Sequence, residues 1–202
     1  VTHESLFLFS LHFCLKLIKL HRCHEKKYTT THAAYNSLLS KMTFDPDTAH
    51  PRIVLSDDET EMTTADFIQD VPNNPRRFDV ILGALGATGF SSGKHYWEVS
   101  VAGKTCYHLG MTSESSRRKG SISFSPNNDY WTIVLDKQGQ YRAIEHRRTI
   151  PIPTEIQPVT LGILLDYKKG TISFYDSGSR THINSLYFVK GGNISGCDKT
   201  YY

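Results

Sequence analysis

The sequence lacks an uninterrupted apolar run of the roughly 20 residues that a membrane-spanning helix needs. Its one strongly apolar stretch, residues 5–20 (SLFLFSLHFCLKLIKL), is interrupted by Lys16 and Lys19. Cysteines are few, four in 202 residues with no Cys-x-x-Cys pair. This scarcity argues against a zinc ribbon and against a small disulfide scaffold, and indicates a reducing compartment. We therefore expect no metal site and no cofactor.

A strong charge of one sign is also missing. The formal net charge is +3, and residues 1–43 alone carry +4, which leaves −1 for residues 44–202. We expect no nucleic-acid binding, because that calls for many clustered cations facing phosphates. One local excess remains, since residues 104–148 hold eight Lys and Arg against four acids.

The first 43 residues differ from the rest in their residue pattern, and we interpret them as a separate segment. If residues 5–20 are helical, His12, Lys16 and Lys19 share one face, which would suit an amphipathic helix at a membrane surface. A truncated cytoplasmic end of a membrane helix is a second option, because cations follow the apolar run. Non-native sequence is a third. Membrane association is thus open for this segment.

From Phe44 onward, short β-like runs alternate with Gly, Pro, Asn, Asp and Ser clusters, which is typical of an all-β sandwich or barrel. In HYWEVSV, Trp97, Val99 and Val101 alternate with more polar residues and predict a half-buried strand. LGILL, residues 161–165, is apolar on both faces, as a central strand would be. The turns between runs predict mostly antiparallel sheets.

An ordered series of motifs identifies the family that this region resembles. The motifs are FDPDTAHPRIVLS, NPRRFD, GFSSGKHYWEVSV, YHLGM, RRKG, DYWTIVL and LGILLDYKKGTISFYD. Together they resemble the PRY-SPRY domain of butyrophilins and tripartite-motif ubiquitin ligases, over residues 44–186. The resemblance implies a bent β-sandwich of two antiparallel sheets whose loops bind partners, without a catalytic centre. We expect these loops around residues 66–80, 104–120 and 136–150.

The resemblance fades near residue 186, and residues 187–202 form a divergent tail. We therefore expect that the family's last strands, which normally close the sandwich, are absent from the sequence. A sheet without closing strands would keep an unpaired edge and an uncovered apolar face. We expect a sandwich that lacks its last strands.

Alternation places Tyr107, Leu109 and Met111 in the core and turns His108 away from them. In some butyrophilins, matching positions line a basic pocket for pyrophosphate-bearing metabolites, because guanidinium and ammonium groups suit a diphosphate. The resemblance therefore nominates five ligand-binding candidates: His108, Lys119, Arg142, Arg147 and Arg148. The leading option for these residues is the binding of an acidic protein or peptide partner. The alternative without function is that they are simply solvated cations at the surface.

No enzyme motif is present. The glycine-rich GALGATGFSSGKH fails the phosphate-loop spacing, because Thr88 stands where a glycine is needed and His95 follows Lys94. We expect a non-enzymatic, cytoplasmic recognition domain of a butyrophilin-like immune regulatory protein. The alternatives are the substrate-recognition domain of a tripartite-motif E3 ubiquitin ligase and a nonfunctional truncated fragment. The sequence leaves the partner's identity and the oligomeric state open.

Overall fold

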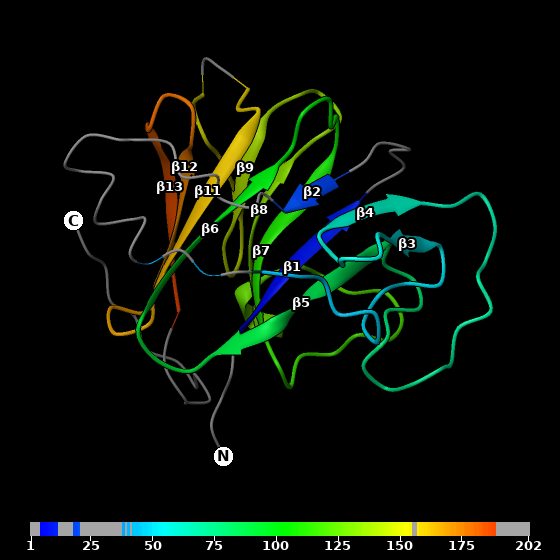
Figure 1. Cartoon of the computed structure of the whole chain (residues 1–202). Helices are drawn as coiled ribbons and strands as arrows, with labels where there is room; N and C mark the ends of the chain where they lie inside the picture. The colour runs from blue at the N-terminus through cyan, green and yellow to red at the C-terminus, as the bar shows by residue number, and fades with distance from the viewer. Residues whose placement is uncertain are drawn as a thin grey trace.

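The computed structural model describes residues 5–11, 18–20, 38, 40, 42–154 and 157–188. In these residues the chain folds into two packed antiparallel sheets, shown in Figure 1. The all-β sandwich expected from the sequence is thereby confirmed. The only helical element among the described residues is the single turn η1 (Pro126–Asn128).

The first sheet has six strands in the order β10-β9-β8-β7-β1-β5. Every neighbouring pair in it is antiparallel. Its strands, in chain order, are β1 (Ser5–Leu11), β5 (Gly83–Phe90), β7 (Tyr107–Ser113), β8 (Tyr130–Leu135), β9 (Tyr141–Ile144) and β10 (Thr149–Pro151).

The second sheet has seven strands in the order β13-β12-β11-β6-β2-β4-β3. Its strands are β2 (Ile18–Leu20), β3 (Ile53–Leu55), β4 (Glu61–Thr64), β6 (Lys94–Ser100), β11 (Thr160–Asp166), β12 (Thr171–Asp176) and β13 (His182–Tyr187). The central position of β11, between β6 and β12, agrees with the apolar run at residues 161–165.

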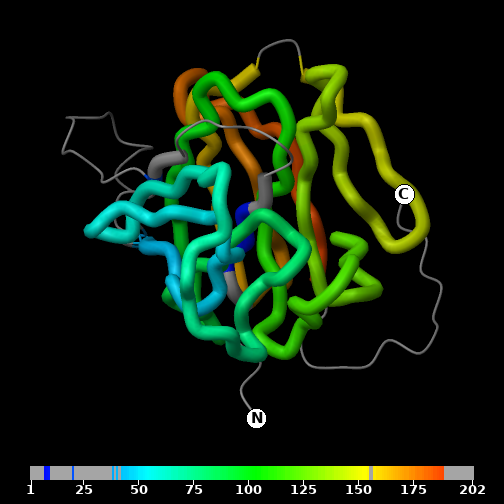
Figure 2. The backbone as a smooth tube through the Cα atoms, turned by 90° about the vertical axis from the view of Figure 1, so that its right-hand side faces the viewer, coloured from blue at the N-terminus to red at the C-terminus, as the bar shows by residue number. Residues whose placement is uncertain are grey.

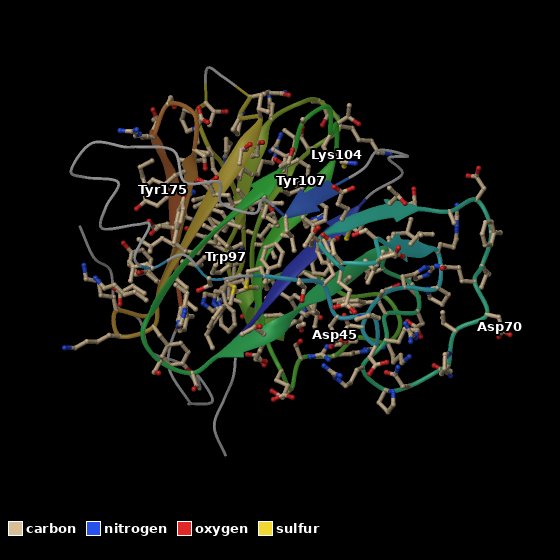
Figure 3. All side chains as sticks on the ribbon, in the orientation of Figure 1. Asp45, Asp70, Trp97, Lys104, Tyr107 and Tyr175 are labelled. Atoms are coloured by element: carbon tan, nitrogen blue, oxygen red, sulfur yellow. The ribbon has the colours of Figure 1, made fainter. Side chains whose placement is uncertain are left out.

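The main core lies between the two sheets. Trp97 of β6 is 2% exposed and sits in the interior, as Figure 3 shows. The ring of Phe7 meets it edge-on at 5.5 Å between centroids, and Phe90 stacks on it at 5.8 Å. Burial of one such aromatic side chain contributes about 1.5–3 kcal/mol, so these rings account for much of the folding free energy.

The opposite face of the six-stranded sheet carries a smaller cluster. Leu8 of β1 and Tyr130 of β8 are fully buried there, against Phe78 and Phe124 from the flanking loops. The alternation predicted for β7 is also observed: Tyr107, Leu109 and Met111 are buried in the main core, whereas His108 faces the other side. Both faces of this sheet are therefore covered, at least in part.

The N-terminal segment differs from the sequence interpretation. A helix is one expectation for residues 5–20, but the described parts of this stretch, Ser5–Leu11 and Ile18–Leu20, are strands, and both lie inside the sheets. Phe7, Leu8 and Phe9 are all fully buried. The physical reason is that an internal strand buries both of its faces, whereas a surface helix buries only one. The sheets thus gain internal strands from the N-terminus, while residues beyond 188 lie outside the described part.

Candidate partner-binding surface

Exposed large apolar side chains gather on one loop. Six such side chains are exposed among the described residues. Three of them lie between β4 and β5: Phe67 at 66%, Ile68 at 74% and Val80 at 53% exposure. The others, Val54, Val159 and Tyr187, come from separate parts of the chain. Single exposed apolar residues are ordinary, whereas an adjacent aromatic and aliphatic pair is a typical feature of an interaction site.

The backbone on both sides of this apolar pair is anchored. Ala65 N–H donates to the Arg52 carbonyl at 2.8 Å, and Gln69 N–H donates to the Pro51 carbonyl at 2.9 Å. The Gln69 side-chain amide also donates to the Ile53 carbonyl at 2.6 Å. Only residues 66–68 lie between these anchors. Phe67 and Ile68 are therefore held outward by a fixed backbone, which lowers the entropy that a partner must overcome.

The second half of the same loop is fixed by a buried arginine. Arg77 is 5% exposed, and its guanidinium donates to three backbone carbonyls, those of Pro72, Pro46 and Ala49, at 2.7–2.9 Å. Asn74 adds a turn, because its side-chain oxygen accepts from the N–H groups of residues 76 and 77. These bonds tie the loop to the segment that precedes β3.

A second loop joins the first. The Lys119 ammonium donates to the Asn73 side-chain oxygen at 3.2 Å, and Gly120 N–H donates to the Asp79 carboxylate at 2.7 Å. Two of the three loops expected from the sequence thus form one surface, which we call the loop surface and define as residues 65–80 and 114–120. The third, around residues 136–150, includes the β9–β10 hairpin, which lies apart from residues 65–80 in Figure 2.

The loop surface carries exposed charges of both signs in addition to its apolar pair. Asp66 and Asp70 flank the apolar pair, and Asp70 points outward at the edge of the molecule in Figure 3. Arg117 supplies an exposed cation from the second loop. Exposed apolar side chains together with charged ones are common in protein-binding surfaces.

Two of the predicted ligand residues share one row on the outer face of the six-stranded sheet. Register places His108 opposite Val134, and Val134 opposite Arg142. We call these three residues the cation row. The His108 ring packs against Phe124 at 4.7 Å between centroids. The backbones of His108 and Arg142 are therefore two strand spacings apart, a distance of about 10 Å.

The arginine of the cation row already has an anionic partner. Arg142 Nε donates to the Asp136 carboxylate at 2.7 Å, and its terminal nitrogen donates to the Gln140 side chain at 3.1 Å. The backbone N–H of Gln140, and then Arg142, hold the pKa of Asp136 below its usual value. The carboxylate therefore stays ionised at neutral pH and competes with any external anion for this guanidinium.

The remaining predicted ligand residues, Lys119, Arg147 and Arg148, lie in loops outside the cation row. Lys119 follows the far end of β7 from His108, and five strand residues span about 17 Å. Arg147 and Arg148 lie in the β9–β10 hairpin, where Arg148 Nε meets the Glu145 carboxylate at 3.2 Å. Neither family resemblance nor alternation predicts these pairings. Their role in binding stays a prediction.

Sequence reasoning named the loop at residues 66–80 but missed its apolar pair. A signal exists in ADFIQD, where Phe67 and Ile68 stand between two acids outside any β-like run. An apolar pair that cannot join a strand must either fold back onto the body or remain exposed. The hydrogen bonds of Ala65 and Gln69 decide the outcome, and these are visible only in three dimensions.

Metal and membrane features are limited in the described residues. No group of three or more His, Cys, Asp or Glu side chains there is arranged to hold a metal ion. In the same part of the chain, no helix has the length and apolar character of a membrane crossing.

Comparison with known families gives two adjacent matches. The model for the SPRY-associated domain, PRY, matches residues 42–90, and the model for the SPRY domain matches residues 94–192. The chain is similar to human erythroid membrane-associated protein, with 42% identity over 77% of this chain and 32% of that protein. It is similar to the E3 ubiquitin-protein ligase TRIM69 of Rattus norvegicus, with 39% identity over 71% of this chain and 28% of the ligase.

Solved structures of the same fold are also found. The crystal structure of the TRIM65 PSpry domain matches with a TM-score of 0.70 at 18% identity, over 83% of this chain and 88% of that one. Stonustoxin matches with a TM-score of 0.67 at 28% identity, over 75% of this chain and 25% of that one. The chain spans less than a third of the length of the two curated relatives above.

Proposed function

The chain belongs to the PRY-SPRY family, and from this premise we propose that it is a non-enzymatic recognition domain that binds a protein partner through the loop surface. SPRY domains in general bind protein partners. The observation that carries the assignment to this surface is the exposed pair Phe67 and Ile68, held between the backbone anchors at Ala65 and Gln69.

Several physical features favour the loop surface over other parts of the molecule. Exposed apolar area gains free energy when a partner covers it, at about 25 cal/mol per Å². Aromatic side chains at the centre of a patch commonly dominate the binding energy. The fixed backbone around Phe67 reduces the ordering cost, and the mixed charges of the loop surface can select among partners.

The proposed partner presents an apolar pocket or groove that receives Phe67 and Ile68, bordered by polar groups of both signs. An acidic partner and a phosphorylated metabolite both depend on available cations. The pairings of Arg142 with Asp136 and of Arg148 with Glu145 weaken support for those two hypotheses. A protein partner with an apolar contact requires neither cation.

For the whole protein, we favour the cytoplasmic part of a butyrophilin-like membrane protein with an immune regulatory role. The support is the 42% identity to erythroid membrane-associated protein. The substrate-recognition domain of a tripartite-motif ligase is the second candidate, supported by 39% identity to TRIM69. Upstream coding sequence separates them, because immunoglobulin-like domains with a spanning helix favour the first, whereas RING and B-box modules favour the second.

The proposal can be tested once a partner has been isolated by affinity capture with the intact chain. Its affinity is then measured by calorimetry for the wild type, for the double variant Phe67→Ala/Ile68→Ala and for Val159→Ala. Val159 is 65% exposed, close to the 66% of Phe67, but lies in a different loop. The double variant should lose at least about 30-fold in affinity, and the control less than about twofold. Equal affinities for all three proteins would refute the assignment.

The remaining alternative, a nonfunctional fragment, makes a different prediction. Such a fragment should not give a soluble protein with a cooperative thermal transition. A single sharp transition, seen by circular dichroism and by tryptophan fluorescence at the same temperature, would argue against it.

A further inference from the structure

The N-terminal segment holds an unusual place in both sheets. β1 lies between β7 and β5, and β2 lies between β6 and β4. Both strands precede residue 42, where the family match begins. Each is therefore an internal strand that comes from outside the matched domain. Figure 1 shows β1, in dark blue, running between β7 and β5.

The two matched segments share no direct strand pairing in the described structure. The PRY segment contributes β3, β4 and β5, and the SPRY segment contributes β6 to β13. In the six-stranded sheet, β5 reaches β7 only through β1, and in the seven-stranded sheet, β4 reaches β6 only through β2. Among the described strands, every sheet connection between the PRY and SPRY segments therefore passes through β1 or β2.

The pairing of β1 is extensive. With β7 it runs in continuous register from Ser5 opposite Ser113 to Leu11 opposite Tyr107. With β5 it covers a similar length, with one shift in register between Leu6 and Leu8. An internal strand satisfies hydrogen bonds on both of its edges and on the facing edges of its two neighbours. Removing β1 would leave both β5 and β7 with an open edge.

The side chains of β1 pack against buried residues on both faces of the sheet. Phe7 and Phe9 enter the main core, where Phe9 stacks on Tyr107 at 5.6 Å between centroids. Leu8 joins the smaller cluster on the opposite face. Gly86 of β5 leaves space for this strand, because a Cβ atom there would lie 3.2 Å from the Cβ of Phe7. The body of the domain is thus shaped to receive β1.

β2 makes the matching connection in the other sheet. Leu20 is 2% exposed, lies opposite Val99 of β6, and donates its N–H to the Thr60 carbonyl at 2.7 Å. Ile18 lies opposite Met62 of β4. Three residues thus link the β3–β4 pair to the rest of that sheet.

We propose that β1 and β2 act as a staple that joins the PRY and SPRY strands and so fixes the two halves of the loop surface relative to each other. Residues 65–80 belong to the PRY half and residues 114–120 to the SPRY half. Direct links between these loops are few, such as the hydrogen bonds from Lys119 to Asn73 and from Gly120 to Asp79. The inference does not rest on the proposed function.

The test uses the full chain with a protease site inserted between residues 24 and 36. The folded protein is cleaved and passed over a size-exclusion column in native buffer. The N-terminal piece should co-elute with the body, since two internal strands and a buried aromatic pair hold it. It should leave only when the body unfolds. A body that releases the piece and keeps its original thermal midpoint would overturn the proposal.

Point variants provide an independent measurement in the uncut chain. Leu8→Asp places a charge on a fully buried position of β1, whereas Val54→Asp places one on β3 at a position that is 37% exposed. We expect the first to lower the thermal midpoint by about 10 °C or more, and the second by no more than about 4 °C. In the first variant, amide hydrogens of β5 and β4 should also exchange faster than those of β11 and β12. Equal midpoints for the two variants would contradict the staple.

Discussion

The loop surface and the cation row differ in how available their side chains are for contacts with a binding partner. Phe67 and Ile68 are mostly exposed and fixed from both sides, whereas the guanidinium of Arg142 already binds Asp136. A partner gains free energy by covering the apolar pair. An anion at Arg142 must first compete with a carboxylate of the same molecule. Availability, more than residue type, therefore distinguishes the two regions.

The two regions also differ in how they are built. The cation row sits on strands whose spacing is set by the sheet, so its residues are placed by register alone. The loop surface lies outside the strands and lacks their regular ladder of backbone hydrogen bonds. Side chains provide hydrogen bonds in its place, above all the guanidinium of Arg77. A loop that must present side chains outward needs such internal partners, because its backbone carbonyls would otherwise be buried without donors.

The largest expected effect comes from removing that buried guanidinium. Arg77→Met should lower the free energy of unfolding by about 3 kcal/mol, because three carbonyls lose their donor. Arg148→Met is the control, since the Arg148 side chain is 74% exposed and pairs with Glu145, whose side chain is 43% exposed. It should cost about 1 kcal/mol or less. Denaturant titration compares the two, and equal losses would show that Arg77 is no anchor.

The next largest expected effect concerns Tyr107 of β7 and Tyr141 of β9, which lie on the core-facing side of the sheet that carries the cation row. The hydroxyls of Tyr107 and Tyr141 are hydrogen-bonded to each other in the core. Burial raises the pKa of Tyr107 well above its usual value and that of Tyr141 to about 12, so both stay protonated. Either Tyr→Phe change should cost about 1–2 kcal/mol, because it leaves one buried hydroxyl unpaired. The double variant should cost less than the sum of both, as a double-mutant cycle by denaturant titration would show.

A smaller effect tests whether Asp136 blocks the cation row. Asp136→Asn removes the carboxylate that holds Arg142, so the affinity for inorganic pyrophosphate should rise by about twofold to fivefold. Calorimetry or chemical-shift titration measures both proteins, with Asp129→Asn as a control at an exposed acid. Micromolar binding of pyrophosphate by the wild type would contradict this interpretation and favour the predicted diphosphate site.

The smallest expected effect is a pH dependence at the base of the loop surface. Burial lowers the pKa of His50, whose Nδ1 accepts from Arg52 N–H and whose Nε2 meets the Asp79 carbonyl at 3.2 Å. The folded state therefore favours neutral imidazole. This contribution is complete above the unfolded pKa near 6.5 and is lost as the pH falls through that value toward the lower folded pKa.

The His50→Gln variant isolates that contribution. The difference in unfolding free energy between the wild type and His50→Gln should be larger at pH 7.5 than at pH 5. Denaturant titrations at the two values measure it, and other titrating groups cancel in the difference. A difference that grows on acidification would have the wrong sign for a buried neutral histidine.

Local patterns predicted the strands well. Alternation identified the buried side of β7 and the outward direction of His108, and the unbroken apolar run at residues 161–165 identified a central strand. These features follow from the two-residue period of a strand, which is visible in any short window of sequence. The motif series was also sufficient to predict the family and its sandwich.

The pairing of strands that lie far apart in the sequence could not be predicted from these short-range patterns. The insertion of residues 5–11 between β5 and β7 joins parts of the chain more than 70 residues apart, and an apolar run of that length suits a helix or a strand equally. The pairing of Arg142 with Asp136 and the exposure of Phe67 likewise depend on how a hairpin and a loop close. Sequence supplied the candidate loops, and tertiary contacts decide which side chains in them are available.

The measurement that tests the central claim most directly compares two double variants against one isolated partner. Phe67→Ala/Ile68→Ala removes the apolar pair, and Arg142→Ala/Arg147→Ala removes two cations of the predicted basic site. With both variants shown to keep the wild-type thermal midpoint, calorimetry gives each dissociation constant. We predict a loss of about 30-fold or more for the first and less than about threefold for the second. The reverse order would place the partner at the basic residues and contradict the account.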